Sequence, residues 1–128
     1  MKLFKSDTSW VLTFKHAFSG MAHLIKTEKS FRVHFSFAVA ALLLLVIFQA
    51  ALLEWVIILL VIGMVISSEI LNTAIEIMVD IYCPFYHPLA KISKDVGAAA
   101  VLFSAIISII IGLLIFMPYI ITLFKSFY

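Results

Sequence analysis

The sequence predicts an all-α integral membrane protein in which an amphipathic interfacial helix precedes three transmembrane helices. Hydrophobic residues make up 65% of the chain and charged residues only 12%, whereas soluble domains are about half apolar and about a quarter charged. The mean hydropathy is +1.21. Three apolar runs are also long enough for the ~20 residues that cross a bilayer. A chain of 128 residues supports one domain, residues 1–128.

Residues 8–28 predict the amphipathic helix. Their large apolar side chains recur at spacings of three and four, which is typical of one helical face: Val11, Phe14, Phe18, Met21 and Ile25. Lysines and histidines fall largely elsewhere around this helix, which suits the membrane interface; packing against its own protein is the alternative. The segment lacks an apolar stretch followed by a small-residue cleavage site, so we do not expect a cleaved signal peptide.

The predicted transmembrane helices cover residues 33–53, 55–82 and 96–124. A short turn at residues 49–54 is expected between the first two. Residues 83–95 predict a loop, because Pro84 and Pro88 interrupt any helix that would fuse the second and third spans. The third span has a small residue at every fourth position, which predicts close packing against a neighbouring helix: Ala100, Ser104, Ser108 and Gly112.

The basic residues predict the orientation of the chain. Eight of the nine lie before the first span or in the 83–95 loop, and only Lys125 follows the third span. By the positive-inside bias, the N-terminus and this loop face the cytoplasm and the C-terminus lies outside. The net charge of +2 and the scattered lysines argue against nucleic acid as a partner. The single cysteine, Cys83, excludes a disulfide within the chain.

A polar stripe marks the second span, and it consists of Glu69, Asn72, Glu76 and Asp80. At ~100° per residue these side chains share one narrow helical face. An ionisable residue in mid-bilayer costs about 2.5 kcal/mol or more, so the stripe is a functional hypothesis. Glu69 lies about 21 Å along the helix from Trp55, in the cytoplasmic third of the hydrocarbon, and Glu76 and Asp80 emerge at the interface.

The depth of each carboxylate suggests its chemistry. The deeper one, Glu69, suits a general base that acts on a hydroxyl at headgroup level, whereas the shallower ones, Glu76 and Asp80, suit Mg²⁺. Glu28, just before the first span, could supply a second metal ligand at the same level. The alternatives are a polar network between helices for the stripe and an exposed salt-bridge partner for Glu28. For Asp80 a purely structural role is the alternative.

Ser93, Lys94, Asp95 and Gly97 are expected to open the third span at this same level. Free N–H groups at a helix start favour phosphate, and Lys94 adds a positive charge. Alternatively, Lys94 is a flanking residue that reaches for headgroups and Asp95 a residue favoured at helix starts. The sequence has no GxxxxGK[ST] loop and no protein-kinase motifs, so any nucleotide would bind differently.

Three segments resemble the prokaryotic diacylglycerol kinase and undecaprenol kinase family: Glu69-Ile-Leu-Asn-Thr-Ala-Ile-Glu-Ile-Met-Val-Asp80, Tyr86-His-Pro-Leu-Ala-Lys91 and Lys94-Asp-Val-Gly-Ala-Ala99. The resemblance extends over nearly the whole chain. It implies a homotrimeric lipid kinase of a bacterial plasma membrane, with active sites shared between subunits. Such an enzyme transfers the γ-phosphate of MgATP to a lipid hydroxyl at the cytoplasmic interface.

Carried over by position, the resemblance implies that Glu69 is the general base and meets the lipid, that Asn72 orients the reacting groups, and that Glu28 and Glu76 bind Mg²⁺. The implied ATP contacts are His16, Glu28, Glu76, Phe85, Tyr86, His87, Lys94 and Asp95. His16 departs from the tyrosine common in diacylglycerol-specific members. The Tyr86–Lys91 and Thr27–His34 segments look closer to Gram-positive undecaprenol kinases, so undecaprenol is the favoured substrate and diacylglycerol the alternative.

Two further functions remain open at this point. A small proton-coupled transporter would use Glu69 as its proton carrier, but would leave Glu28, Lys94 and Asp95 without a role. A non-enzymatic scaffold would tolerate replacement of all the acidic residues in the stripe by amides.

Overall fold

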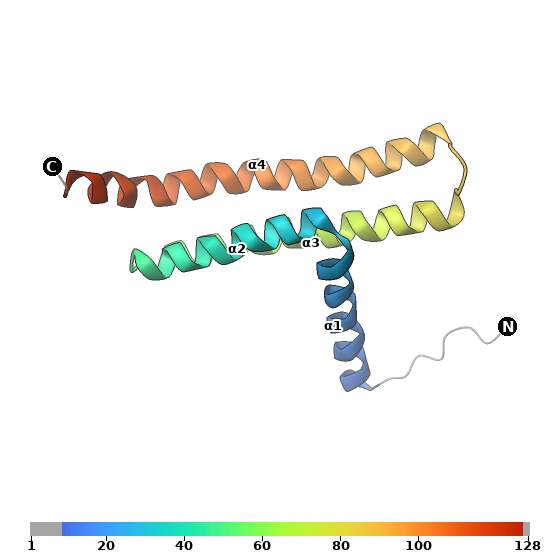
Figure 1. Ribbon diagram of the computed structural model, residues 1–128, viewed down its shortest axis with the longest axis horizontal. Coiled ribbons are helices and arrows are strands. Elements are labelled where there is room, and N and C mark those ends of the chain that lie inside the picture. The colour runs from blue at the N-terminus through green and yellow to red at the C-terminus, as the bar shows by residue number, and fades with distance from the viewer. Residues whose placement is uncertain (1–8, 127–128) are drawn as a thin grey trace.

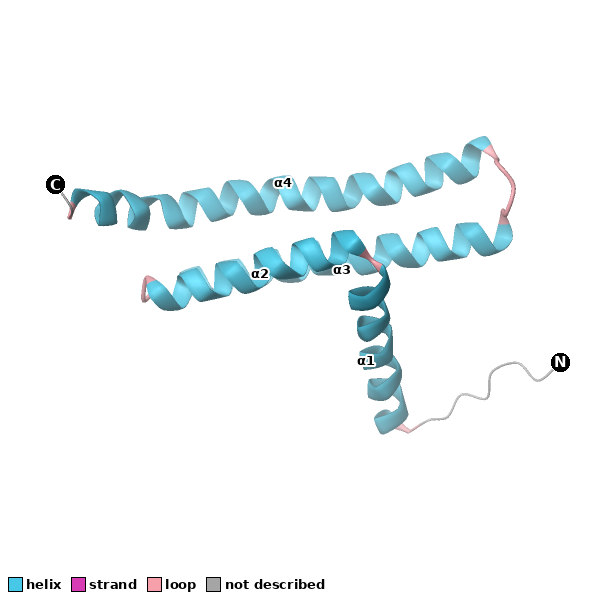
Figure 2. Ribbon diagram, viewed as in Figure 1, coloured by secondary structure: helices cyan, strands magenta, loops and turns pink. Residues whose placement is uncertain are grey.

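The computed structural model describes residues 9–126, and these residues are almost entirely helical (Figure 1). The helices are α1 Trp10–Thr27, α2 Lys29–Ile47, α3 Leu52–Tyr82 and α4 Pro88–Lys125. Short loops join them, and the described part of the chain contains no strand (Figure 2). The all-α prediction is confirmed.

Helices α2, α3 and α4 are each long and apolar enough to cross a membrane. They run along the long axis of the molecule, and α4 returns antiparallel to α3 (Figure 1). Large apolar side chains cover the outside of this bundle; Leu60 and Phe103, for example, are 69% and 67% exposed. Surfaces of this kind are rare on soluble monomers. The prediction of three helices that can span a membrane is therefore confirmed, and the exposed apolar surface indicates a membrane protein.

Helix α1 leaves the bundle at a steep angle (Figure 1). The break falls at Glu28, whose backbone is extended at φ −94° and ψ 114°. The Arg32 guanidinium stabilises the break, because Nη1 donates hydrogen bonds to Ile25 O at 3.2 Å and Lys26 O at 3.1 Å. Only Leu24 of α1 is buried, and the predicted apolar face of this helix is exposed. The predicted start at Thr8 lies outside the described residues.

The predicted end of the first span is wrong by six residues, since α2 ends at Ile47 rather than at residue 53. Gln49 adopts a left-handed backbone at φ 50°, and the next helix starts at Leu52. The Glu54 carboxylate fixes this start by accepting a hydrogen bond from Ala51 N at 2.8 Å. The turn predicted at residues 49–54 overlaps the observed break, which lies between Ile47 and Leu52.

The predicted loop over residues 83–95 is also wrong in its extent, because α4 begins at Pro88 and not at residue 96. Proline is favoured at the first helical position, where its missing N–H has no partner to lose. His87 precedes it as the N-cap, and its Nδ1 accepts a hydrogen bond from Leu89 N at 3.2 Å. The loop is therefore short, and Lys94 and Asp95 lie in the second turn of α4.

Helices α2, α3 and α4 pack against one another at the end of the bundle that is far from this loop. Leu45, Ile58 and Phe116 form the buried cluster there. Tyr119 donates a hydrogen bond to Glu54 Oε2 at 2.6 Å, which ties α4 to the start of α3. The predicted small-residue packing of α4 is only partly formed: Ser104 is buried and bonded to Ser68 at 2.9 Å, whereas Ser108 and Gly112 line an apolar groove.

Candidate functional site

The polar stripe of α3 passes from the interior of the bundle to its surface. The Glu69 side chain is 2% exposed, Asn72 and Glu76 are half-buried, and Asp80 is exposed. The stripe contacts two helices, because Glu69 meets α2 whereas Asn72 and Asp80 meet α4. A buried carboxylate is therefore followed along the same helix by progressively more accessible polar groups.

Glu69 lies level with the start of α2. Its Oε1 accepts a hydrogen bond from the hydroxyl of Ser30, in the first turn of α2. Helix α2 has 19 residues, which at ~1.5 Å each is about the ~30 Å thickness of the hydrocarbon. The rest of α3, from Ile70 to Tyr82, continues about 20 Å beyond that level. A bilayer that matches α2 thus places Glu69 near its boundary and Glu76 outside the hydrocarbon.

Asn72 is held between Glu76 and the backbone of α4. Its Nδ2 donates a hydrogen bond to Glu76 Oε1 at 2.8 Å. Its Oδ1 is enclosed without a hydrogen-bond partner among the described residues and packs against Gly97, where a Cβ would stand only 2.5 Å away. The absence of a side chain at Gly97 thus sets the position of the amide, and the amide restrains Glu76.

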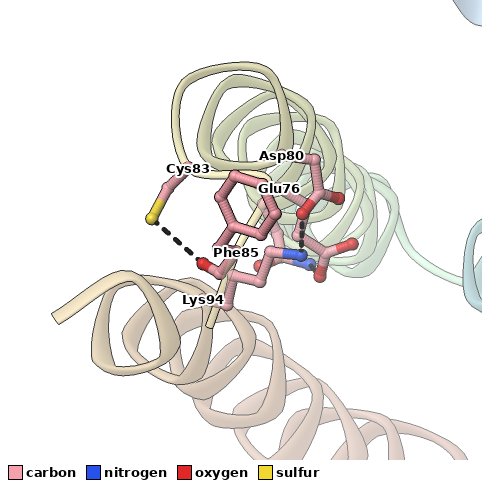
Figure 3. Close-up of polar contacts among 6 residues, drawn as sticks. Glu76, Asp80, Cys83, Phe85 and Lys94 are labelled. Atoms are coloured by element: carbon pink, nitrogen blue, oxygen red, sulfur yellow. Dashed lines mark hydrogen bonds and ion pairs between the residues drawn. The ribbon is translucent and has the colours of Figure 1, made fainter. Parts of the chain in front are cut away.

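Lys94 reaches from α4 to the last member of the stripe. Its Nζ lies 2.5 Å from Asp80 Oδ1 (Figure 3). A cavity of about 370 Å³ adjoins this pair, and its lining includes Phe85, Tyr86, His87 and Lys91. Cys83 Sγ contacts Phe85 O at 3.4 Å and closes the loop around the cavity. The contact of Asp80 with Lys94 was not predicted from the sequence. The one signal for it was that Asp80 lies on the same polar face of the helix as Glu69, Asn72 and Glu76.

Other residues predicted for the site lie apart from this cavity. Asp95 pairs with Lys91 at 3.3 Å and is 63% exposed. His16 is exposed on α1, and Glu28 lies at the break between α1 and α2, where it accepts a hydrogen bond from Thr27 at 3.2 Å. The predicted phosphate-binding helix start at Ser93–Gly97 is wrong, because only the first turn of a helix has free N–H groups and α4 starts at Pro88.

The carboxylates do not form a ready-made metal cluster. Over residues 9–126 no group of three or more His, Cys, Asp or Glu side chains is placed to share an ion. One oxygen of Glu76 accepts a hydrogen bond from Asn72, and one oxygen of Glu28 accepts a hydrogen bond from Thr27. The second oxygen of each carboxylate is available to a metal ion. Such a sparse set suits Mg²⁺, which usually keeps waters and substrate phosphates beside one or two carboxylates.

An apolar groove of about 300 Å³ lies on the other side of Glu69, between α2, α3 and α4. It begins near Val33, His34 and Val65, about one helical turn from Ser30 and Glu69, and extends as far as Phe116. Apart from His34 and Ser108 its lining is hydrocarbon. The buried carboxylate therefore stands between a surface that suits a lipid chain and a polar cavity.

Comparison with known proteins relates the chain to membrane lipid kinases. Residues 15–116 match the family described as prokaryotic diacylglycerol kinase. An undecaprenol kinase of Bacillus subtilis is 46% identical over 106 residues, which cover 83% of this chain and 86% of that protein. A diacylglycerol kinase of Synechocystis sp. is 33% identical over 109 residues, which cover 84% of this chain and 62% of that protein.

Proposed function

The chain belongs to the prokaryotic diacylglycerol kinase family, and from this membership we propose that it phosphorylates undecaprenol. In the proposed reaction, the primary hydroxyl of undecaprenol attacks the γ-phosphorus of ATP at the cytoplasmic interface of a bacterial plasma membrane. The products are undecaprenyl phosphate and ADP. The structural observation that carries phosphate transfer to a lipid is the buried carboxylate of Glu69, which lies along α3 between the residues of an apolar groove and those of a polar cavity.

In this proposal Glu69 is the general base. Its carboxylate lies at the level of the first turn of α2, which is the depth of a lipid hydroxyl whose hydrocarbon remains in the bilayer. The carboxylate takes the hydroxyl proton as the oxygen–phosphorus bond forms and the bond from the γ-phosphorus to the ADP oxygen breaks. Asn72 orients Glu76 through its amide, and the hydroxyl of the lipid reacts within reach of both.

The nucleotide occupies the cytoplasmic side of the site. The cavity beside Lys94 is lined by Phe85, Tyr86 and His87, and these rings give a surface for a flat base. Lys94 contacts the phosphates as a point charge. Glu28 and Glu76 would hold Mg²⁺ together with water and phosphate oxygens. The ion, when bound, offsets the negative charge of the transferred phosphoryl group.

We further propose that the enzyme is a homotrimer with shared sites. His16 and Asp95, both implied as ATP contacts, lie outside the cavity that their own chain forms. Contact from a neighbouring subunit would bring them to it. The extensive apolar surface of α2, α3 and α4 supplies area for both lipid and neighbouring subunits. Helix α1 then lies in the cytoplasmic interface, with the N-terminus inside and the C-terminus outside, as the distribution of lysines predicts.

The identity of the lipid is tested by direct competition of the two acceptors. Undecaprenol and diacylglycerol are compared in matched mixed micelles at saturating MgATP, with phosphate transfer followed by radiolabel. We expect a higher kcat/KM for undecaprenol. Diacylglycerol is the second candidate, because a diacylglycerol kinase is among the relatives, and the reverse ranking would establish it. Transfer to neither lipid would contradict the assignment as a lipid kinase.

Removing the Glu76 carboxylate is expected to weaken the response to Mg²⁺. In the Glu76→Ala variant we expect the Mg²⁺ concentration at half-maximal rate to rise about 10-fold or more, because the ion loses a carboxylate and Asn72 loses its acceptor. A Mg²⁺ titration at fixed ATP measures this shift. Glu54→Gln, at the far end of α3, is the matched control. A titration curve that matches the unmodified protein would exclude Glu76 as a ligand.

A further inference from the structure

Ser30 uses its hydroxyl differently from the hydrogen-bonded serines elsewhere in the helices. The hydroxyl of a helical serine usually bonds to the carbonyl of its own preceding turn. Ser36, Ser68 and Ser104 all do so, to Arg32 O at 2.8 Å, Met64 O at 2.9 Å and Ala100 O at 2.8 Å, although Ser68 and Ser104 also bond to each other. Ser30 instead donates its hydrogen bond across to α3, to the carboxylate of Glu69. The hydroxyl of Ser30 therefore belongs to the site rather than to its own helix.

The bend between α1 and α2 explains why this hydroxyl is free. Ser30 lies in the first turn of α2, so the carbonyl four residues earlier, that of Lys26, belongs to α1. That carbonyl already accepts a hydrogen bond from Arg32 Nη1 at 3.1 Å. Glu28, with its extended backbone, turns α1 away from the bundle. The hydroxyl of Ser30 is left without its usual local acceptor and points to Glu69.

The contact has a direct consequence for the two oxygens of Glu69. Over residues 9–126, Ser30 is the one hydrogen-bond partner of the carboxylate, through Oε1. The other oxygen, Oε2, has no hydrogen-bond partner among these residues. It is not sealed off, since the one enclosed and unpartnered side-chain oxygen in this part of the chain is Asn72 Oδ1. A glutamate has three rotatable side-chain bonds, and fixing one oxygen restricts them. Oε2 is thereby presented in one direction.

We propose that Ser30 is a positioning residue for the general base, holding Oε1 of Glu69 so that Oε2 faces the hydroxyl of the lipid. This proposal rests on the proposed role of Glu69. The proton of Ser30 stays on Ser30 throughout. The lipid proton passes to Oε2, the lipid oxygen bonds to the γ-phosphorus, and the bridging oxygen leaves with ADP.

The test is the steady-state kinetics of substitutions at Ser30. In Ser30→Ala we expect kcat to fall about 10-fold to 100-fold, because misplacing a reacting group by about 1 Å costs a factor of this size. We expect KM for ATP and for lipid to stay within about twofold, because the serine binds neither substrate. Ser30→Thr keeps the hydroxyl and is expected to restore kcat. Ser30→Cys, a weaker donor, is expected to give an intermediate rate.

Ser36→Ala is the matched control, because Ser36 is exposed on the same helix and bonds only to its own backbone; its kinetics should not change. A full kcat in Ser30→Ala would overturn the proposal. So would an increased kcat/KM for lipid, which would show that the serine competes with the lipid hydroxyl, or a Ser30→Thr variant as slow as alanine. Glu69→Gln is measured in parallel: if that variant remains active, the general-base role itself fails, independently of Ser30.

Discussion

Replacing Glu69 by glutamine is expected to reduce phosphate transfer to lipid by about 100-fold to 10,000-fold, which is the usual contribution of a general base. Glutamine has the same shape as glutamate and its carbonyl oxygen can still accept the hydrogen bond of Ser30. It cannot accept a proton from the lipid hydroxyl. The rate of transfer from labelled ATP, in micelles that contain undecaprenol, measures the loss.

The same variant should keep its fold and its nucleotide binding. The cavity lined by Phe85, Tyr86 and Lys94 lies beyond Glu69 along α3, so the affinity for a fluorescent ATP analogue is expected to be unchanged. Glu54→Gln is the control for the loss of one carboxylate from α3, since Glu54 contacts Ala51 and Tyr119 at the opposite end of the helix. Substantial turnover by Glu69→Gln, with Glu54→Gln equally active, would exclude Glu69 as the base.

The sequence was sufficient for the helical architecture and for the polar stripe. Each span is long and apolar, so burial in lipid leaves a helix as its one satisfactory backbone arrangement. The stripe could be recognised because Glu69 is an expensive residue in an apolar helix and because Asn72, Glu76 and Asp80 follow at helical spacing. These properties depend on residues within one helix, which a linear pattern records.

The pattern of residues along one helix does not predict which residues of different helices are in contact. The pairing of Lys94 with Asp80 depends on where α4 begins, and Pro88 starts that helix eight residues before the predicted span. A proline between two apolar runs is compatible with a loop and with a first helical turn alike, and tertiary packing decides between them. Once α4 starts at Pro88, Lys94 falls on the side that faces α3 and Asp95 falls on the exposed side.

Ser30 was missed for a related reason. A serine in a helix gives no signal in sequence, because most such hydroxyls bond to their own backbone. Its contact with Glu69 spans 39 positions and follows from the bend at Glu28, which lies between two segments that both read as helix. The functional meaning of Ser30 therefore appears only when α2 and α3 are placed side by side.

Gly97→Ala is the second substitution from which we expect a large loss of activity. A Cβ at this position would lie 2.5 Å from Asn72 Oδ1, which is closer than ordinary contact allows. Either the amide or α4 must move, and the hydrogen bond from Asn72 to Glu76 is lost or redirected. We expect kcat/KM to fall about 100-fold, as for other small displacements of a reacting site.

Helix propensity acts in the opposite direction, which makes the substitution informative. Alanine is favoured over glycine in a helix by about 1 kcal/mol, so a loss of activity or stability at this position has to come from crowding against Asn72. Gly63→Ala in α3 is the matched control, because nothing lies within 4 Å of its added Cβ and Gly63 does not line the apolar groove. That variant should retain its activity and its thermal stability.

A double variant separates crowding from chemistry. In Gly97→Ala combined with Asn72→Ala, the shortened side chain makes room for the new methyl group, so thermal stability should recover relative to Gly97→Ala alone. Turnover should remain low, because Glu76 no longer receives the amide hydrogen bond. Recovery of both stability and turnover would show that Asn72 serves only as packing. Full activity in Gly97→Ala itself would show that α4 yields easily and that the close approach of Gly97 to Asn72 does not position the site.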